Sequence, residues 1–218
     1  MPEFESPWLA TAKGSEYKEA RVFYTKTGRA KYISHLDVTR CFQRALQRAG
    51  LSVWYTEGFN PHSYLTFTLP LSLGYESLCE SMDIRLTRPT ALETAGQVRD
   101  RLNGALPPDF RVTRVAAPAR KPDAVAKARY RVRLTAEGAA GEELRAEFLR
   151  FLDSGPIEVE KRAKKGVKTI DIRPDVELLS LEALPDGLLL SLAMTAGPAR
   201  NVNPTLLTVE FCKRAGLP

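Results

Sequence analysis

The chain has two histidines, and both lie in polar segments whose side chains could exchange protons or bind a ligand. His35 lies between Tyr32 and Asp37 in Tyr-Ile-Ser-His-Leu-Asp, and His62 ends the segment that begins at Glu57, Glu-Gly-Phe-Asn-Pro-His. Histidine changes charge near neutral pH and therefore suits general acid and base catalysis. If the fold brings the two rings together, they form a candidate catalytic pair, with Tyr32 as a third candidate.

The same segments also have the composition of a binding pocket. Gly58 and Pro61 favour a rigid turn, from which Phe59 would stack on a base or anchor a partner. Such loops often carry binding residues. The alternative is structural: His35 extends a helix cap, Phe59 fills the core, and His62 packs on Phe59. The predicted pocket consists of His35, Asp37, Glu57, Phe59, Asn60 and His62.

Three arginines, Arg40, Arg44 and Arg48, lie four residues apart in a predicted helix. This spacing places them in one row opposite the apolar face. A row of charges often only faces solvent, but like charges at this spacing repel one another, which favours an anionic neighbour. Residues 21–56 carry seven basic side chains and one acidic side chain, so positive charge is concentrated around this row.

Two further basic clusters lie in the second half of the chain. Arg129, Arg131 and Arg133 alternate along the polar face of a predicted strand. The other cluster surrounds Gly166 at a predicted hairpin tip and consists of Lys161, Arg162, Lys164, Lys165 and Lys168. The aromatic residues available for stacking on bases are Tyr24, Trp54, Tyr55 and Phe59. Together these features predict binding to a phosphate backbone, although an acidic protein would select the same basic pattern.

The elements expected to position these groups follow a split βαβ order. Alternating apolar residues predict strands over 21–26, 51–55, 65–69, 82–86 and 110–115. Ser34 and Gly50 bound the first predicted helix, while Thr90 and Glu93 open the second. This order, with one extra hairpin arm, predicts a ferredoxin-like domain with an antiparallel sheet and helices on one face.

A second unit of the same kind is expected after a segment rich in Ala, Pro and Lys. Strands are predicted at 130–134, 157–160, 168–172, 176–181 and 188–194, with one helix from Glu142 and another from Asn203. The fold class is therefore α+β, with two ferredoxin-like halves. The predicted boundaries are a leader at 1–20, a first domain at 21–116, a linker at 117–128 and a second domain at 129–218.

Composition narrows the classes of function. The chain has 218 residues, a formal charge of +6, and three cysteines without Cys-x-x-Cys spacing, which indicates a reducing, cytoplasmic environment. No secretory signal and no apolar run long enough to cross a bilayer is present in the sequence. No phosphate-binding glycine loop, dinucleotide motif or zinc-protease motif occurs either, so we expect no cofactor and no metal.

Several motifs resemble the radical SAM-linked protein family. They are Arg21 to Asp37, Arg48-Ala-Gly, Tyr55 to His62 and Leu69-Pro-Leu-Ser-Leu-Gly, and the likeness extends to about residue 204. Members of that family are small domains of unknown function fused to, or encoded beside, cobalamin-binding radical SAM proteins. The resemblance implies such an enzyme as the partner and supplies no catalytic residues. Because the chain lacks a cysteine triad, it would be the accessory half.

These observations lead to three hypotheses. The first is an accessory module that binds RNA, such as tRNA or rRNA, through its basic surfaces for a radical SAM enzyme. The second is a metal-independent ribonuclease that uses His35 or His62 as general base, for which the only precedent is a fold-level likeness to tandem ferredoxin-like RNA-processing endonucleases. The third is an adaptor that docks on an acidic surface of the radical SAM enzyme. No membrane partner is expected.

Overall fold

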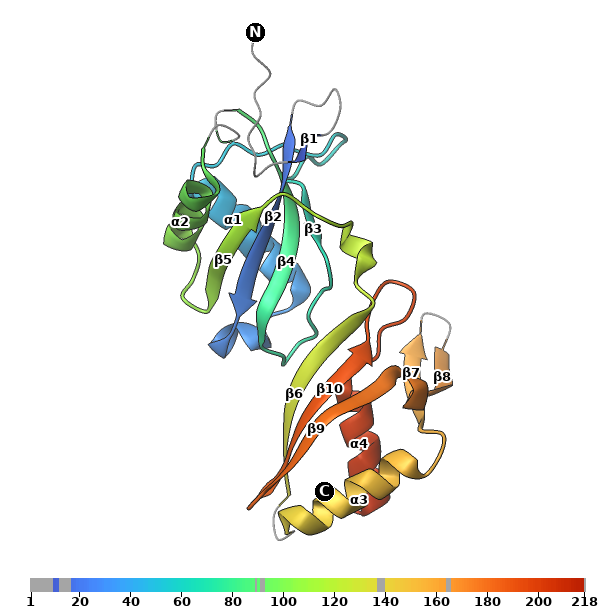
Figure 1. The fold of residues 1–218 in the computed structure, drawn as a ribbon. Helices are drawn as coiled ribbons and strands as arrows, with labels where there is room; N and C mark the ends of the chain where they lie inside the picture. The colour runs from blue at the N-terminus through green and yellow to red at the C-terminus, as the bar shows by residue number, and fades with distance from the viewer. Residues whose placement is uncertain are drawn as a thin grey trace. The chain divides into compact units, whose positions relative to one another are not determined.

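The computed structural model describes residues 10–11, 17–88, 90, 93–136, 140–163 and 166–217. The chain folds as two compact units, residues 1–124 and 125–218, each with its own hydrophobic core (Figure 1). The boundary between the units falls within the segment predicted as a linker. In the described part of the chain, no helix is both long and apolar enough to cross a membrane.

The first unit contains a five-stranded antiparallel sheet. At its centre, β2 (Lys18–Lys26) pairs with β4 (Ser77–Leu86). On the outer sides, β5 (Phe110–Ala116) pairs with β2 and β3 (Leu65–Phe67) pairs with β4, while the short β1 (Ala10–Thr11) joins the start of β2. Apart from β1, the spatial order is β5, β2, β4, β3, which matches the predicted ferredoxin-like arrangement.

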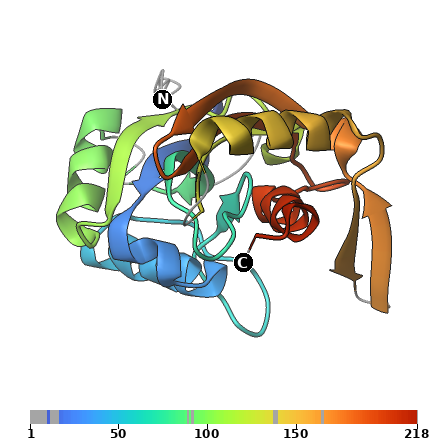
Figure 2. The same cartoon turned by 90° about the horizontal axis from the view of Figure 1, so that it is seen from below.

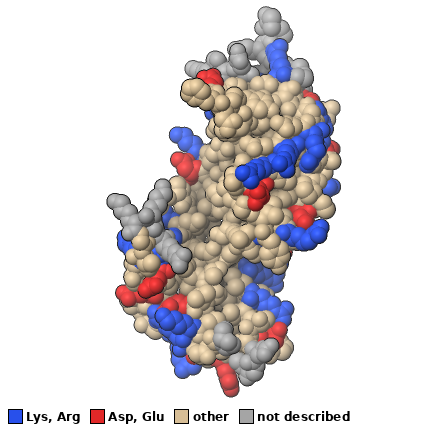
Figure 3. Space-filling model, turned by 180° about the vertical axis from the view of Figure 1, so that it is seen from behind, with Lys and Arg blue, Asp and Glu red and all other residues tan. Residues whose placement is uncertain are grey.

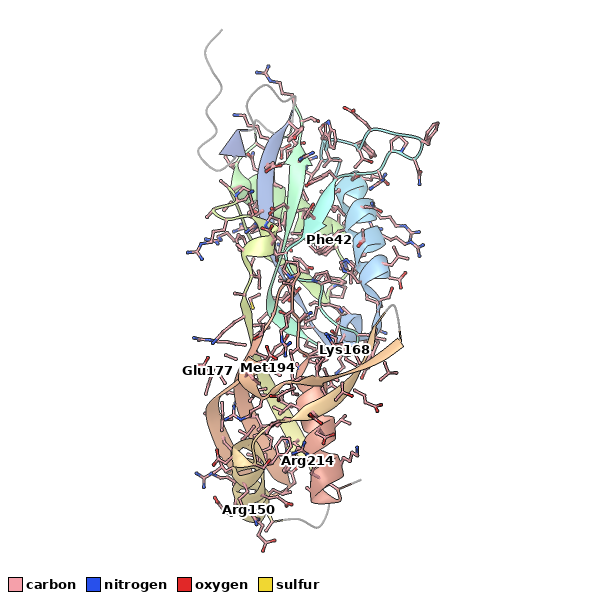
Figure 4. All side chains as sticks on the ribbon, turned by 90° about the vertical axis from the view of Figure 1, so that its right-hand side faces the viewer. Phe42, Arg150, Lys168, Glu177, Met194 and Arg214 are labelled. Carbon is pink, nitrogen blue, oxygen red and sulfur yellow. The ribbon has the colours of Figure 1, made fainter. Side chains whose placement is uncertain are left out.

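Both helices of the first unit cover one face of this sheet (Figures 1 and 2). As predicted, α1 (His35–Arg48) begins after Ser34, whose Oγ accepts a hydrogen bond from the Asp37 N–H at 3.2 Å. It ends before Gly50, whose φ of 63° favours glycine. Phe42, on the buried face of α1, packs on the sheet with no solvent exposure (Figure 4).

The second helix, α2 (Ala95–Ala105), begins later than the sequence suggested. Thr94 and Gln97 form its capping box, so the prediction of a start at Thr90 and Glu93 was wrong. The physical reason is that the Thr90 hydroxyl already accepts a hydrogen bond from the backbone N–H of Ser52, at 2.6 Å.

The predicted strand at 51–55 forms only isolated bridges, Val53 with Leu86 and Tyr55 with Ser63. This segment meets only the last residues of β4, and from Tyr55 onward the chain pairs with its own return segment. The apolar residues of this segment alternate as they do in a strand, but no neighbouring strand edge is long enough to pair with the segment.

The second unit contains a three-stranded antiparallel sheet in which β10 (Gly187–Thr195) lies between β6 (Lys127–Thr135) and β9 (Val176–Leu184). Two helices, α3 (Gly141–Asp153) and α4 (Pro204–Ala215), pack their buried phenylalanines and leucines against it. As predicted, Asn203 caps α4: its side chain accepts a hydrogen bond from the Thr205 N–H.

Residues 157–172 hold an insertion in the second unit. β7 (Glu158–Ala163) and β8 (Gly166–Asp171) pair as a separate hairpin between α3 and β9. The remaining order, β6, α3, β9, β10 and α4, is that of a split βαβ unit without its last strand in the described residues. The predicted α+β class, with antiparallel sheets and helices on one face, is confirmed.

Candidate functional site

Arg40, Arg44 and Arg48 project from one side of α1, and we call them the arginine row. They line a shallow depression of about 340 Å³ together with Asp37, Cys41 and Pro107. Figure 3 shows a band of Lys and Arg side chains across the helical face of the first unit. The row forms because the buried positions of α1, such as Phe42, fall on the opposite side of the helix.

The three arginines differ in how far their charge is already neutralised. Arg40 lies 3.4 Å from the Asp37 carboxylate, and both side chains are about half exposed. Arg48 donates a hydrogen bond to the Ala105 carbonyl at the end of α2, at 2.6 Å. Arg44 is exposed and forms no ion pair within the described residues. The depression is therefore a site of net positive charge.

Burial keeps the thiol beside the row in its neutral form. Cys41 is half-buried in the depression, and burial raises the pKa of its thiol, while Arg48 and Arg44 act in the opposite direction. A neutral thiol is a poor nucleophile, so the depression is suited to binding rather than covalent chemistry.

His35 lies at the other side of α1, at its first turn. Its ring meets the Phe67 ring edge-on, with centroids 4.7 Å apart. Partial burial lowers the pKa of His35, and the nearby ammonium of Lys26 lowers it further. At neutral pH the imidazole is therefore mainly uncharged. The Asp37 carboxylate already has a hydrogen-bond partner, because it accepts a hydrogen bond from the Ser34 hydroxyl at 2.6 Å.

His62 lies in a loop that precedes β3. Its Nδ1 is 3.1 Å from both the Thr56 hydroxyl and the Asn60 carbonyl, and its backbone N–H donates to the Thr56 hydroxyl. Phe59 at the tip of this loop is fully exposed, so the alternative in which it fills the core is wrong. The loop is closed by its own hydrogen bonds and presents Phe59 to solvent.

The two histidines adjoin opposite ends of the sheet in the first unit. His62 precedes the start of β3, whereas His35 follows the end of β2, and β2 and β3 run in the same direction. His62 lies five positions before Phe67, the residue that contacts His35, and five positions of extended chain span roughly 16 Å. The prediction of one pocket containing His35 and Asp37 with residues 57–62 was therefore wrong, and the two histidines form no catalytic pair.

A second group of polar side chains surrounds the end of β2, and we call Tyr24, Lys26, His35 and Glu80 the Lys26 cluster. Tyr24 and Lys26 are each 2% exposed. Tyr24 pairs directly with Glu80 across β2 and β4. Burial lowers the pKa of Lys26 and raises those of Glu80 and Tyr24, and Lys26 and Glu80 partly offset each other's shift. Perturbed groups gathered in this way often mark a functional site.

Sequence reasoning missed this cluster, although a signal was present. Val22, Tyr24 and Lys26 alternate along β2, so Lys26 shares the inward face. Glu80 shares the inward face of β4 with Met82 in the same way. The alternation along β2 and β4 therefore indicates two inward-facing charged side chains on neighbouring strands.

A comparison with known protein families shows which family the chain belongs to. Residues 19–204 match the model of an uncharacterized protein conserved in bacteria, DUF2344. The chain belongs to the DUF2344 family. A comparison with curated proteins found no match. The DUF2344 region includes the arginine row, the Lys26 cluster and the whole β7–β8 hairpin.

The hairpin in the second unit of this DUF2344 chain carries part of the predicted basic cluster. Lys161 and Lys168 are cross-strand partners and both are exposed, with Lys168 on β8 (Figure 4). Lys161 donates a hydrogen bond from Nζ to the Asn201 carbonyl at 2.7 Å. Arg162 belongs to β7, but Lys164 and Lys165 lie outside the described residues.

The basic face of β6 in the DUF2344 chain is partly neutralised. Arg129, Arg131 and Arg133 are all exposed, as the alternation predicted. Arg133 pairs with Asp186 at 2.7 Å. A neighbouring pair joins Lys127 and Glu177 at the same distance.

The aromatic residues predicted to stack on bases have different environments. Tyr24 is buried, so the prediction that it is available for stacking was wrong. Trp54 is half-buried against the Arg85 guanidinium, which also contacts Tyr64. Only Tyr55 and Phe59 of the predicted four are exposed.

The second unit has its own depression, of about 290 Å³, at the ends of α3 and α4. Arg150 and Arg214 line it together with Phe151 and Phe211, and the Arg214 guanidinium lies 5.3 Å from the centre of the Phe151 ring. Arg214 already donates a hydrogen bond to Glu210 at 2.8 Å. Among the described residues, no group of three His, Cys, Asp or Glu side chains is placed to hold a metal ion.

Proposed function

We propose that the chain is an RNA-binding accessory module, in which the arginine row contacts the phosphates of an RNA presented to a separate radical SAM enzyme. The proposal of a radical SAM enzyme as the partner rests only on the resemblance of the sequence motifs. RNA binding rests on one structural observation: three arginines line a common depression, and one of them, Arg44, has no acidic partner in the described part of the chain.

The chemistry of the arginine row favours phosphate. Residues four apart on a helix are separated by roughly 6 Å along its axis, which brings the guanidinium groups close enough to follow successive phosphates of one strand. Guanidinium groups donate paired hydrogen bonds to phosphate oxygens, and they lose less hydration than ammonium groups do. Arg48 retains a positive charge for this purpose because its hydrogen bond is to a neutral carbonyl.

The loop at residues 55–63 adds a feature that favours RNA over an acidic protein. Tyr55 and Phe59 are exposed on the first unit, the same unit that carries the arginine row. Exposed rings stack on unpaired bases, and this combination with basic side chains is typical of single-stranded RNA recognition. An acidic protein surface would require the charges but not the exposed rings.

Filter binding of labelled single-stranded RNA at increasing salt concentration tests the proposal. We expect affinity to fall steeply from about 50 mM to about 300 mM potassium chloride, because each phosphate contact contributes roughly 0.7 to the slope of log K against log salt. Replacing all three residues of the arginine row with Gln should reduce the magnitude of that slope by about 2. The matched control removes three exposed charges from the helices of the second unit: Arg145, Arg150 and Lys213.

Three results would contradict the proposal. The first is a lack of RNA affinity at low salt, and the second is an affinity that does not depend on salt. The third is an equal loss of slope in the arginine-row variant and the control variant, which would indicate only an effect of net charge. Co-purification of a radical SAM enzyme that persists after nuclease treatment, without any RNA affinity, would favour the adaptor hypothesis instead.

A further inference from the structure

The first strand of the second unit has a neighbouring strand on one side only. β6 pairs with β10 over nine consecutive residues without a bulge, and no strand of the described chain pairs with its other edge (Figure 1). In the first unit, the corresponding strand β2 lies between β4 and β5. No strand follows α4 within residues 204–217, so the position that β5 occupies in the first unit is open beside β6.

The open side leaves the core-facing residues of β6 incompletely buried. Val132 and Leu134 pack against the hydrophobic core of the second unit but remain partly exposed. Val22 faces the core from β2, which has a strand on each side, and it has no solvent exposure. A further strand beside β6 would therefore bury additional apolar surface, and this burial would favour its binding.

The ladder between β6 and β10 determines which backbone groups face the open side. At both ends of the ladder, Ala126 and Ala136 form backbone hydrogen bonds with the residues that flank β10. Residues of an antiparallel strand direct their backbone groups alternately to one side and the other, so the even-numbered residues of β6 bond to β10. The N–H and C=O groups that face the open side therefore include those of Arg129, Arg131 and Arg133.

The same three arginines make this edge positively charged. Their side chains are exposed and project from the face of the sheet opposite the core. Arg133 pairs with Asp186, whereas Arg129 and Arg131 form no ion pair with any residue that the structure describes. A second copy of β6 placed antiparallel along this edge would bring arginines opposite arginines, which is destabilising. The charges therefore disfavour pairing with another copy of β6 and favour a strand with acidic residues.

We propose that the open edge of β6 binds an extended segment of a partner protein, in which acidic and apolar residues alternate, as a further strand of the sheet. The acidic residues of the segment lie beside Arg129, Arg131 and Arg133 and exchange backbone hydrogen bonds with them. The apolar residues cover Val132 and Leu134. Strand addition of this kind obtains its affinity from main-chain hydrogen bonds and its specificity from alternate side chains. The interaction does not depend on RNA binding, because the arginine row lies in the first unit.

Fluorescence anisotropy with a labelled nine-residue peptide tests this edge on the full chain. The peptide alternates Glu and Val, and we expect it to bind saturably. N-methylation of the Glu amides, which would face β6, should weaken binding at least about tenfold, because it removes the donors of the new ladder. N-methylation of the Val amides, which would face away from β6, should have little effect. A peptide of the same composition with Glu and Val in separate blocks should also bind at least about tenfold more weakly.

Variants of the chain test the same edge. Arg129→Gln combined with Arg131→Gln should weaken peptide binding severalfold, because each cross-strand charge pair contributes modestly. Arg131→Pro removes an N–H that faces the open side and not β10, so the variant should fold and should bind the peptide at least about tenfold more weakly. The matched control, Arg145→Gln with Arg150→Gln, removes two exposed charges from α3 and should leave peptide binding unchanged.

The outcomes distinguish a partner segment from other occupants of the edge. Absence of saturable binding of the alternating peptide, or equal binding of the two N-methylated peptides, would overturn the proposal. Self-association of the chain that the Arg129→Gln, Arg131→Gln variant abolishes would assign the edge to a second copy. Loss of RNA affinity in that variant, without loss of peptide binding, would assign the edge to RNA. Peptide binding that persists when the arginine row is replaced, even in a chain without RNA affinity, would support the proposal independently of the proposed function.

Discussion

Replacing Asp83 with Asn removes the charge that neutralises a buried arginine. Arg21 and Asp83 face each other across β2 and β4, and their side chains are only 10% and 8% exposed. The hydrogen bonds that Arg21 donates to Asp83 raise the pKa of Arg21. A guanidinium is charged at neutral pH even without such a partner, so Arg21 stays charged in the variant. The Arg120 carbonyl remains as a partner, but it carries no negative charge.

The expected cost follows from leaving that charge buried. Removing one member of a buried ion pair typically destabilises a protein by about 3–5 kcal/mol, a large part of the total stability of a small domain. Replacing both residues, as in Arg21→Met with Asp83→Leu, removes the desolvation penalty together with the attraction. The double variant should lie within about 1 kcal/mol of the wild type or above it. The cycle made of the wild type, Arg21→Met, Asp83→Leu and the double variant should give a coupling energy of about 2–4 kcal/mol.

Urea unfolding at neutral pH, followed by circular dichroism, measures the free energy of unfolding of the wild type and of every variant. An exposed pair provides the control: Arg99 and Asp100 are 43% and 66% exposed at a separation of 2.8 Å, and breaking this pair should cost less than about 1 kcal/mol. The reasoning is refuted if Asp83→Asn costs less than about 1 kcal/mol, or if the double variant is no more stable than the single one.

Two other substitutions test the fold. Lys26→Met should increase the free energy of unfolding, by about 1 kcal/mol at neutral pH, because burial of the side chain disfavours the ammonium group. The pKa of Lys26 is lowered on folding, so the unfolded chain binds the proton more tightly than the folded chain does. The gain in free energy of unfolding that the variant shows at neutral pH should therefore shrink as the pH rises toward about 10.4. A gain that grows with pH would contradict this reasoning. Gly187→Ala should cost about 3 kcal/mol or more, because Gly187 has φ of 153° and a Cβ there would lie 1.9 Å from the Leu134 carbonyl oxygen. Thermal unfolding of Gly155→Ala, a glycine with φ of 98° and open space around it, separates the clash from the backbone strain.

The parts of the fold that could be predicted from the sequence are those set by local chemistry. Ser34 caps α1 and Asn203 caps α4 because each side chain reaches a backbone N–H two or three residues away. The start of α2 could not be predicted in this way, since Thr90 has the right residue type for a cap but bonds Ser52, which is distant in the sequence. Propensity identifies candidate caps, and tertiary contacts select among them.

The same distinction applies to the candidate sites. The arginine row could be predicted because a spacing of four residues on one helix determines its geometry. The histidine pair could not, because its distance depends on the directions of β2 and β3 within the sheet. The Lys26 cluster also depends on pairing between strands, although the inward positions of Lys26 and Glu80 were visible in the alternation of their own strands.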